Sequence, residues 1–295
     1  MSDPELSVVV ASVNGFPYLG ACLDSLRDLC PRAQVIVADC TDAATRQRVR
    51  DGWPFVTLLA FTEPTSVPAL RAAGIFEATS PCVAVIEDHC VILDGWQAAL
   101  LAAQEAGHRV VGGPIRNGLQ ARLRDWPAFL FEYSAFIEPV ERGLATDLPG
   151  MNVCYDRDAV EAIDDLLREG RWESWLHRRL RERGFELFCE PNAVIEHEMD
   201  FGVREFVAQR FHYSRAHADM RNPELGWRRV VYFCGSPLLV PLLYWRVARN
   251  VFRKRQHRVE FVLGSPLLLL YVAVTAVGEA VGYALGGGRS LLRVR

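Results

Sequence analysis

The sequence predicts an α/β protein whose mixed, mainly parallel sheet is flanked by helices, followed by a hydrophobic helical segment that associates with a membrane. Short apolar runs alternate with helical patterns over the first hundred residues, and these runs are continuous, as in strands covered on both faces. After residue 225 long uncharged stretches replace that pattern. We therefore expect a globular domain at 1–225 and a membrane-associating segment with a basic linker at 226–295.

The elements of the first half follow one another as strand, helix and strand. We expect strands at 6–12, 33–40 and 82–88, and helices at 18–29 and 67–78. This order implies βαβ units and therefore parallel strands.

The second half of the domain predicts shorter elements. We expect a strand at 109–115, a loop leading into a helix capped near Asp156 or Asp158, and a helix closed by Gly184. A strand, a turn and a short strand should fill 185–197, and a basic helical segment 206–221.

Polar residues stand where three of the expected strands end. Ser12 and Asn14 follow the first strand, Asp39 ends the second, and Glu87, Asp88 and His89 end the third. Right-handed crossovers place the carboxyl ends of parallel strands on one edge of the sheet, where open α/β sheets bind their ligands. The sequence therefore predicts a binding site at this edge.

Composition excludes some classes of partner and compartment. The formal net charge is -3, so nucleic acid is not an implied partner. The eight cysteines form no C-x-x-C pair, which favours reduced, buried thiols over zinc or disulfides. The first residues, "MSDPELSVVV", lack a basic region before an apolar run, so we expect no signal peptide and a cytoplasmic α/β domain.

Two uncharged stretches, 230–245 and 261–278, contain 16 and 18 residues, and a spanning helix needs about 20. The linker between them, 246–258, carries six Arg or Lys and no acid. A spanning hairpin would carry this linker across the membrane, against the positive-inside tendency. Helices in the interface, or a shallow re-entrant pair, keep it beside anionic headgroups on the cytoplasmic face. We favour the interfacial arrangement, with a hairpin and a pair of buried core helices as alternatives.

A series of motifs between Leu6 and Arg221 resembles the family 2 glycosyltransferases with the GT-A fold. In order, they are "VVVASVNG", "VIVADCTDAAT", "ALRAAGIFEA", "VAVIEDHCVILDGW", "GMNVCYDRDAV", "WESWLHRRLRERGFEL" and "VIEH". The resemblance implies an inverting enzyme that moves a sugar from a nucleotide-sugar donor to a hydroxyl group. With the apolar C-terminal segment, it implies a membrane lipid or lipid-linked acceptor. No G-x-G-x-x-G follows the first strand, which excludes a dinucleotide-binding Rossmann enzyme.

The resemblance also assigns roles to residues. Glu173 lies on the family's second acid and would be the general base. The nucleotide-sugar would contact Ser12, Asn14, Asp39, Arg71, Glu87, Asp88 and Asn152. The acceptor side would include Trp172, Trp175, His197, Gln209 and Arg210. Each also has an ordinary structural interpretation, such as a capped strand end for Glu87 to His89.

Two departures from the family pattern bear on the chemistry. The D-x-D motif here is Glu87-Asp88-His89, and the aspartate of the second acid is Glu173. Imidazole binds Mn²⁺ but suits Mg²⁺ poorly. His89 could therefore ligate a divalent metal, Asp88 could take over as the ligand, or cationic side chains could balance the diphosphate without a metal. The rival function is a non-catalytic, membrane-attached protein that binds a nucleotide or a sugar.

Overall fold

The protein was analysed as a computed structural model that describes residues 4–120, 122–200 and 202–294. The chain forms two compact units. The first unit consists of Met1–Gly118 and Phe136–Met199, and the second of Leu119–Ala135 and Asp200–Arg295. The predicted functional boundary at residue 225 stays a prediction.

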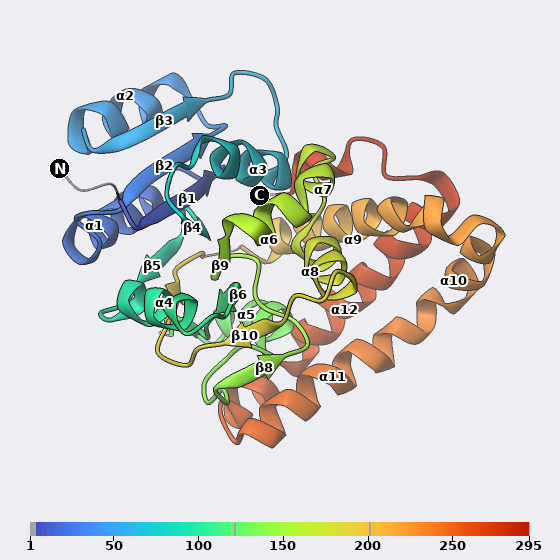
Figure 1. Cartoon of the computed structure of the whole chain (residues 1–295). Coiled ribbons are helices and arrows are strands. Elements are labelled where there is room, and N and C mark those ends of the chain that lie inside the picture. The colour runs from blue at the N-terminus through green and yellow to red at the C-terminus, as the bar shows by residue number, and fades with distance from the viewer. Residues whose placement is uncertain (1–3, 121, 201, 295) are drawn as a thin grey trace. The chain divides into compact units, whose positions relative to one another are not determined.

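The first unit is built on an eight-stranded mixed sheet with the order β3-β2-β1-β4-β9-β6-β10-β8 (Figure 1). Its first four strands are parallel, β9 runs antiparallel to both neighbours, and β6 and β10 are parallel to each other. The strands are β1 (Leu6–Ser12), β2 (Gln34–Asp39), β3 (Val56–Ala60), β4 (Cys82–Glu87), β6 (Val110–Gly112), β8 (Gly143–Ala145), β9 (Val153–Asp156) and β10 (Leu187–Cys189). The predicted mainly parallel sheet is confirmed.

Helices of the first unit cover this sheet. They are α1 (Tyr18–Leu29), α2 (Ala43–Gly52), α3 (Val67–Glu77), α4 (Trp96–Glu105), α6 (Arg157–Ala162), α7 (Asp164–Arg168) and α8 (Glu173–Glu182). All seven residues of β1 are buried, which explains its continuous apolar sequence. Helix α3 packs closely on this strand, because a Cβ atom at Gly74 would lie 2.3 Å from the side chain of Val9.

A second, three-stranded sheet has the order β5 (Cys90–Ile92), β11 (Ile195–His197) and β7 (Ile115–Asn117). The strand expected at 109–115 is therefore two strands in different sheets. Gly113 separates them, and its backbone approaches that of Ala193 so closely that a Cβ atom there would lie 1.9 Å from the carbonyl oxygen. No larger residue fits this crossing.

The predicted elements of the first half are confirmed to within one or two residues, but the segment before Asp156 was wrongly expected to be a loop. It forms β9, which is short and lies between β4 and β6. Asp156 caps helix α6 by accepting a hydrogen bond from the Ala159 amide at 2.7 Å, as the sequence predicts.

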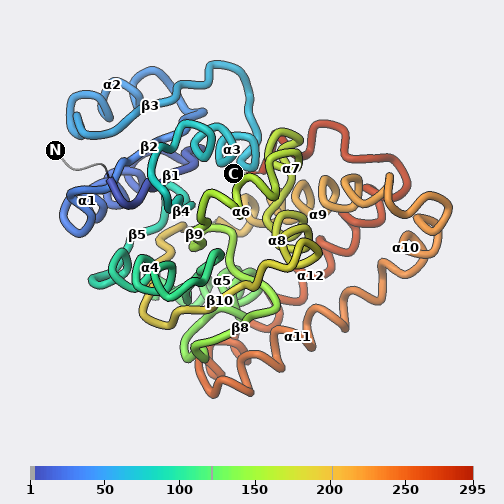
Figure 2. Tube along the Cα trace, in the orientation of Figure 1, coloured from blue at the N-terminus to red at the C-terminus, as the bar shows by residue number. Residues whose placement is uncertain are grey.

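The second unit is helical. It contains α5 (Asp125–Tyr133), α9 (Val203–Leu225), α10 (Arg229–Gly235), α11 (Leu239–Lys254) and α12 (Arg258–Leu285), with short 3-10 turns at Gly226–Arg228, Ser236–Leu238 and Ser290–Arg293. Figure 2 shows α10 and α11 following each other in one long trace. Helices α9 and α12 approach closely at two glycines: a Cβ atom at Gly278 would lie 2.1 Å from Ser214 Oγ, and one at Gly282 2.5 Å from the Arg215 carbonyl oxygen.

By length and composition, two helical stretches of this unit could cross a membrane, Val203–Lys254 and Arg258–Leu285. In the most apolar part of each, 11% and 44% of the residues are buried. Length and composition thus allow these two stretches to associate with a membrane.

Candidate active site

The polar strand ends converge as the sequence predicts. Ser12 of β1 pairs in register with Asp39 of β2, and Ala11 pairs with Glu87 of β4, so three neighbouring strands end side by side. Asp39 is buried and accepts hydrogen bonds from the amide and the hydroxyl of Thr41, at 3.3 and 2.7 Å. The buried Ser12 hydroxyl has no hydrogen-bond partner among the described residues.

Asp88 anchors the loop that follows β1. Its Oδ2 atom accepts hydrogen bonds from the backbone amides of Val13, Asn14 and Gly15 at 2.7–3.0 Å. Its Oδ1 atom accepts from the Asn14 side chain at 3.0 Å and lies 3.1 Å from His89 Nδ1. Burial opposes ionisation, but the hydrogen bonds from His89 and Asn14 outweigh it and hold the pKa of Asp88 below its usual value. The Asp88 carboxylate therefore binds groups of the protein and stabilises the loop after β1.

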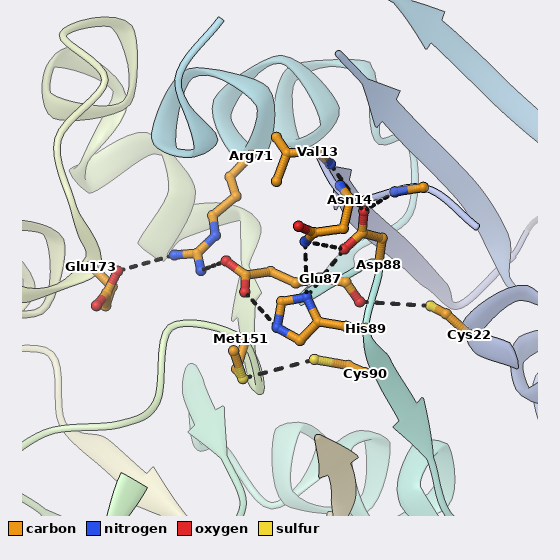
Figure 3. A network of polar contacts seen from close by, with 11 residues as sticks. Val13, Asn14, Cys22, Arg71, Glu87, Asp88, His89, Cys90, Met151 and Glu173 are labelled. Atoms are coloured by element: carbon orange, nitrogen blue, oxygen red, sulfur yellow. Dashed lines mark hydrogen bonds and ion pairs between the residues drawn. The ribbon is translucent and has the colours of Figure 1, made fainter. Parts of the chain in front are cut away.

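Glu87, the neighbouring acid, belongs to a different cluster, which is centred on Arg71 of helix α3 (Figure 3). The Arg71 guanidinium donates to Glu87 Oε1 at 2.5 Å and to Glu173 Oε2 at 3.0 Å. It also lies over the ring of Trp172, with 5.9 Å between Cζ and the ring centre. Burial disfavours its charge, yet the two carboxylates outweigh burial and raise the pKa of Arg71. Arg71 therefore stays charged between two acids.

Glu173 is the first residue of helix α8, where the helix dipole favours a negative charge. Its side chain is 23% exposed and lies against the backbone of Gly150. A Cβ atom at Gly150 would lie 2.6 Å from Glu173 Cδ, so a glycine at this position provides the space for the carboxylate.

His89 links the two clusters. Its Nδ1 atom faces Asp88 at 3.1 Å and its Nε2 atom faces Glu87 Oε2 at 3.3 Å. The edge of the ring packs against His197, with 4.6 Å between the ring centres. Burial and, to a lesser degree, the electrostatic influence of the neighbouring His89 ring hold the pKa of His197 well below its usual value. His197 is therefore neutral near pH 7.

Comparison of the sequence with models of protein families shows which family the chain belongs to. The model of the family described as "Glycosyl transferase family 2" matches residues 7–164, which is more than half of the 295 residues. The chain belongs to glycosyl transferase family 2. A search of curated proteins found no match.

Solved structures share the GT-A fold of this family 2 glycosyltransferase. The mannosyltransferase PcManGT from Pyrobaculum calidifontis, in complex with GDP-Man and Mn²⁺, has a TM-score of 0.53 at 15% identity, over 98% of this chain and 78% of that one. GalNAc-T7, with UDP, GalNAc and Mn²⁺, has a TM-score of 0.52 at 13% identity, over 66% and 43%. S. aureus TarS has a TM-score of 0.50 at 13% identity, over 95% and 55%. The chain thus spans less than two thirds of the last two structures. Family and fold together identify a nucleotide-sugar-dependent glycosyltransferase.

Two of these neighbours contain Mn²⁺, so we asked whether the residues of this family 2 enzyme fit a divalent metal. Asp88 is occupied by hydrogen-bond donors, and both ring nitrogens of His89 face carboxylates. Among residues 4–120, 122–200 and 202–294, no group of three or more His, Cys, Asp or Glu side chains could hold a metal ion. In this arrangement, the residues predicted to be metal ligands do not form a metal site.

Asn152, Trp172 and Trp175 occupy buried positions in the glycosyltransferase. The Asn152 side chain accepts from Trp96 Nε1 at 2.8 Å and donates to the carbonyl groups of Pro114 and Ala193 at 3.1 and 2.7 Å. Its polar atoms thus tie backbone segments together. The two tryptophans are 4% and 5% exposed and lie close to Glu173 in sequence, and their acceptor-side role stays a prediction.

Gln209 and Arg210 belong to helix α9 of the second unit. Arg210 is buried, donates to Glu132 at 2.7 Å and lies over the rings of Phe131 and Tyr213. The charge of Arg210 is thus paired with a carboxylate of helix α5 within the second unit. Their acceptor-side role stays a prediction.

Asp147, Tyr155 and His177 received no predicted role from the sequence, and Gly150 entered only as the first residue of a motif, although the structure places all four in or beside helix α8. One signal was present in the sequence: His177 follows Glu173 by four residues, which places both on one face of a helix.

Proposed function

We propose that this glycosyltransferase inverts the anomeric centre of its donor sugar, with Glu173 as the general base and a hydroxyl of a membrane-confined molecule as the acceptor. The observation that supports Glu173 as the base is the pair of hydrogen bonds that Arg71 donates to Glu173 and to Glu87 at the end of β4. It holds a partly exposed carboxylate, at the N-terminus of a helix, beside the edge where α/β sheets bind ligands.

In the proposed reaction a carboxylate oxygen of Glu173 takes the proton of the acceptor hydroxyl. The acceptor oxygen forms a bond to the anomeric carbon, and the bond from that carbon to the diphosphate breaks on the opposite face. The electron pair leaves with the nucleoside diphosphate. One displacement with one base inverts the configuration.

The donor side of the proposal uses the neighbouring strand ends. Ser12, Asn14 and Asp39 would contact the nucleoside, and Glu87 would help to orient the ribose. Arg71 would face the diphosphate. Since two carboxylates, Glu87 and Glu173, already share this one arginine, a divalent cation that arrives with the donor would lower the repulsion from its diphosphate, and the test therefore includes metal arms.

Thermal unfolding in detergent tests donor binding. We would compare UDP, GDP and dTDP, each with Mn²⁺, with Mg²⁺ and with EDTA. A nucleotide at a hundred times its Kd stabilises a protein by about 2.7 kcal/mol, or a rise of roughly 5–10 °C for a domain of this size. We expect such a shift with one nucleotide. Loss of the shift in EDTA would show a metal requirement, and no shift with any nucleotide would contradict the proposal.

The proposal of a membrane-confined acceptor is based on the exposed surface of helix α11 and the residue before it. Leu238, Leu242, Trp245 and Phe252 are exposed at helical spacing on one side, and Val247 on the other side is buried. Arg249 lies in the gap of this exposed stripe, over the Trp245 ring at 5.6 Å. Exposed apolar side chains beside an arginine suit the interface of an anionic bilayer, which supports our proposal that the protein acts at the cytoplasmic face of the membrane.

Sedimentation with vesicles tests this surface. We expect binding to phosphatidylglycerol-rich vesicles, weaker binding to phosphatidylcholine vesicles, and loss of binding on Leu242→Glu with Trp245→Glu. The matched control is Leu144→Glu, which alters a 68% exposed leucine of the first unit and should leave binding unchanged. Equal sedimentation of the double variant and the control would contradict a role for this surface.

A further inference from the structure

A buried histidine on the same helix as Glu173 connects three elements of the first unit. His177 is 1% exposed, and its Nδ1 atom lies 2.7 Å from Asp147 Oδ1. Its Nε2 atom lies 3.0 Å from the hydroxyl of Tyr155. Because a carboxylate only accepts hydrogen bonds, Nδ1 donates to Asp147, and Nε2 pairs with the Tyr155 hydroxyl. Both ring nitrogens thus have partners within the protein.

The segment from Asp147 to Gly150 contacts helix α8 at two places. Asp147 binds His177, and three residues later Gly150 lies against the Glu173 carboxylate. The two contacted helix residues are four positions apart, so the segment runs along the first turn of α8. A shift of this segment therefore moves the surface on which the Glu173 side chain lies.

Tyr155 fixes the other end of this connection in the central sheet. It belongs to β9 and pairs in register with Val83 of β4 and Val110 of β6. Burial and the negative charge of Glu173 raise the pKa of Tyr155, which keeps its hydroxyl protonated and able to donate to His177. Glu173 and Arg71 thus lie within electrostatic reach of this hydroxyl.

We propose that His177, held between Asp147 and Tyr155, is a positioning residue that fixes the first turn of α8 so that the Glu173 carboxylate meets Arg71. This proposal rests on the proposed function of Glu173. It explains why an amphipathic helix buries a polar ring on its inner face, where an apolar side chain would pack without needing two partners.

A double-mutant cycle read by urea unfolding tests the positioning without any substrate. Asp147→Ala removes the partner of His177 from a half-exposed position, so folding should survive. If Asp147 acts on Glu173, the effect of Glu173→Gln on the unfolding constant should change by about five-fold or more in the Asp147→Ala background. The control cycle uses Asp165→Ala, because Asp165 also binds a residue of α8, Arg179, at 2.7 Å and has the same 52% exposure. The control should be additive within about two-fold.

Transfer kinetics give the second readout. We would use UDP-glucose and GDP-mannose as donors and, as acceptor, monoglucosyl diacylglycerol in detergent, a glycolipid whose sugar hydroxyls carry the proton that the base must remove. Asp147→Ala should lower kcat about ten-fold with the donor KM within about two-fold, because a misplaced base loses rate and not donor binding. Asp147→Asn, which still accepts the Nδ1 proton, should restore most of kcat. Asp165→Ala should resemble the unaltered protein.

Two results would distinguish a failure of the positioning role of His177 from a failure of Glu173 as the general base. An additive Asp147 cycle, indistinguishable from the Asp165 cycle, would overturn the positioning role whatever the enzyme's substrates are. Full transfer activity in Glu173→Gln would overturn the general base, and the cycle would still report whether His177 holds this turn of the helix.

Discussion

Two adjacent acids at the end of one strand have opposite surroundings. Asp88 is fully buried, and the donors around it come from the protein, three of them backbone amides. Glu87 is partly exposed and shares the Arg71 guanidinium with Glu173. The first carboxylate is satisfied by the fold alone. The second belongs to a set of charges that a bound donor can rearrange, which is the property of a ligand site.

The difference follows from where the strand ends. Glu87 is the last residue of β4 and Asp88 begins the turn that follows, so the two neighbouring acids meet different partners. Asp88 points to the loop after β1 and fixes its backbone. Glu87 points to helix α3 and to the start of α8. One motif thus divides into a structural acid and an acid available to the donor.

The largest effect is expected from Glu173→Gln, which alters the partly exposed set of charges around Arg71 and should lower the rate of sugar transfer. Glutamine keeps the size of the side chain and its place beside Arg71 but cannot accept a proton, so transfer should fall by about 10²- to 10⁴-fold. The measurement is release of nucleoside diphosphate in the presence of acceptor, with the nucleotide-dependent thermal shift as the control for intact donor binding. A variant that binds nucleotide and transfers sugar at the normal rate would remove Glu173 from the mechanism.

Asp88→Ala alters the buried acid of the pair and should lower the stability of the fold. It leaves several buried donors without an acceptor, so we expect a loss of about 3–5 kcal/mol in the free energy of unfolding. Urea unfolding of the detergent-solubilised protein measures this. The control is Asp28→Ala, which removes an exposed ion pair with Arg27 and should change the stability by less than about 1 kcal/mol. Equal losses in the two variants would show that Asp88 does not anchor the loop.

Gly150→Ala sharpens the comparison, because it displaces Glu173 without removing it. The added methyl group would meet the carboxylate at 2.6–2.7 Å, so the side chain must move and the distance to Arg71 must change. We expect kcat to fall about ten-fold, the order of loss that misplaced catalytic groups show. Gly52→Ala, at a position with no atom within 4 Å of the added methyl group, should leave kcat unchanged.

A smaller effect is expected from His197, which should make the free energy of unfolding depend on pH. Burial and, to a lesser degree, the neighbouring His89 ring lower the pKa of His197 in the folded state, whereas in the unfolded chain it titrates near 6.5. Below that pH the unfolded state binds a proton that the native state does not. Stability is therefore full above about pH 6.5 and falls by about 1.4 kcal/mol per pH unit below it. His197→Gln should show a shallower fall between pH 6.5 and 5, and an identical slope in both proteins would contradict a neutral, buried His197.

The sequence predicts the framework of this site because that framework depends on local signals. Continuous apolar runs mark β1, β2 and β4, and the polar residues that follow them must meet at one edge of a parallel sheet. Short strands carry weaker signals, and β9 was missed because its four residues end in the aspartate that caps the next helix.

The partners within the site depend on distant parts of the chain, which a sequence pattern does not specify. The amides that bind Asp88 lie 73–75 residues away in the chain, and Arg71 and Glu173 are 102 residues apart. For this reason three adjacent titratable residues predicted a ligand site but not which acid serves the fold. The buried His177 had no signal beyond its spacing from Glu173.

The central claim, that Glu87 serves the donor and Asp88 serves the fold, is tested most directly by thermal unfolding of Glu87→Gln and Asp88→Asn with and without nucleotide. We predict that Glu87→Gln keeps the ligand-free Tm within about 2 °C and loses the shift of roughly 5–10 °C that nucleotide causes. Asp88→Asn should lower the ligand-free Tm by several degrees. If Asp88→Asn keeps the ligand-free Tm and Glu87→Gln keeps the nucleotide shift, both assignments are contradicted.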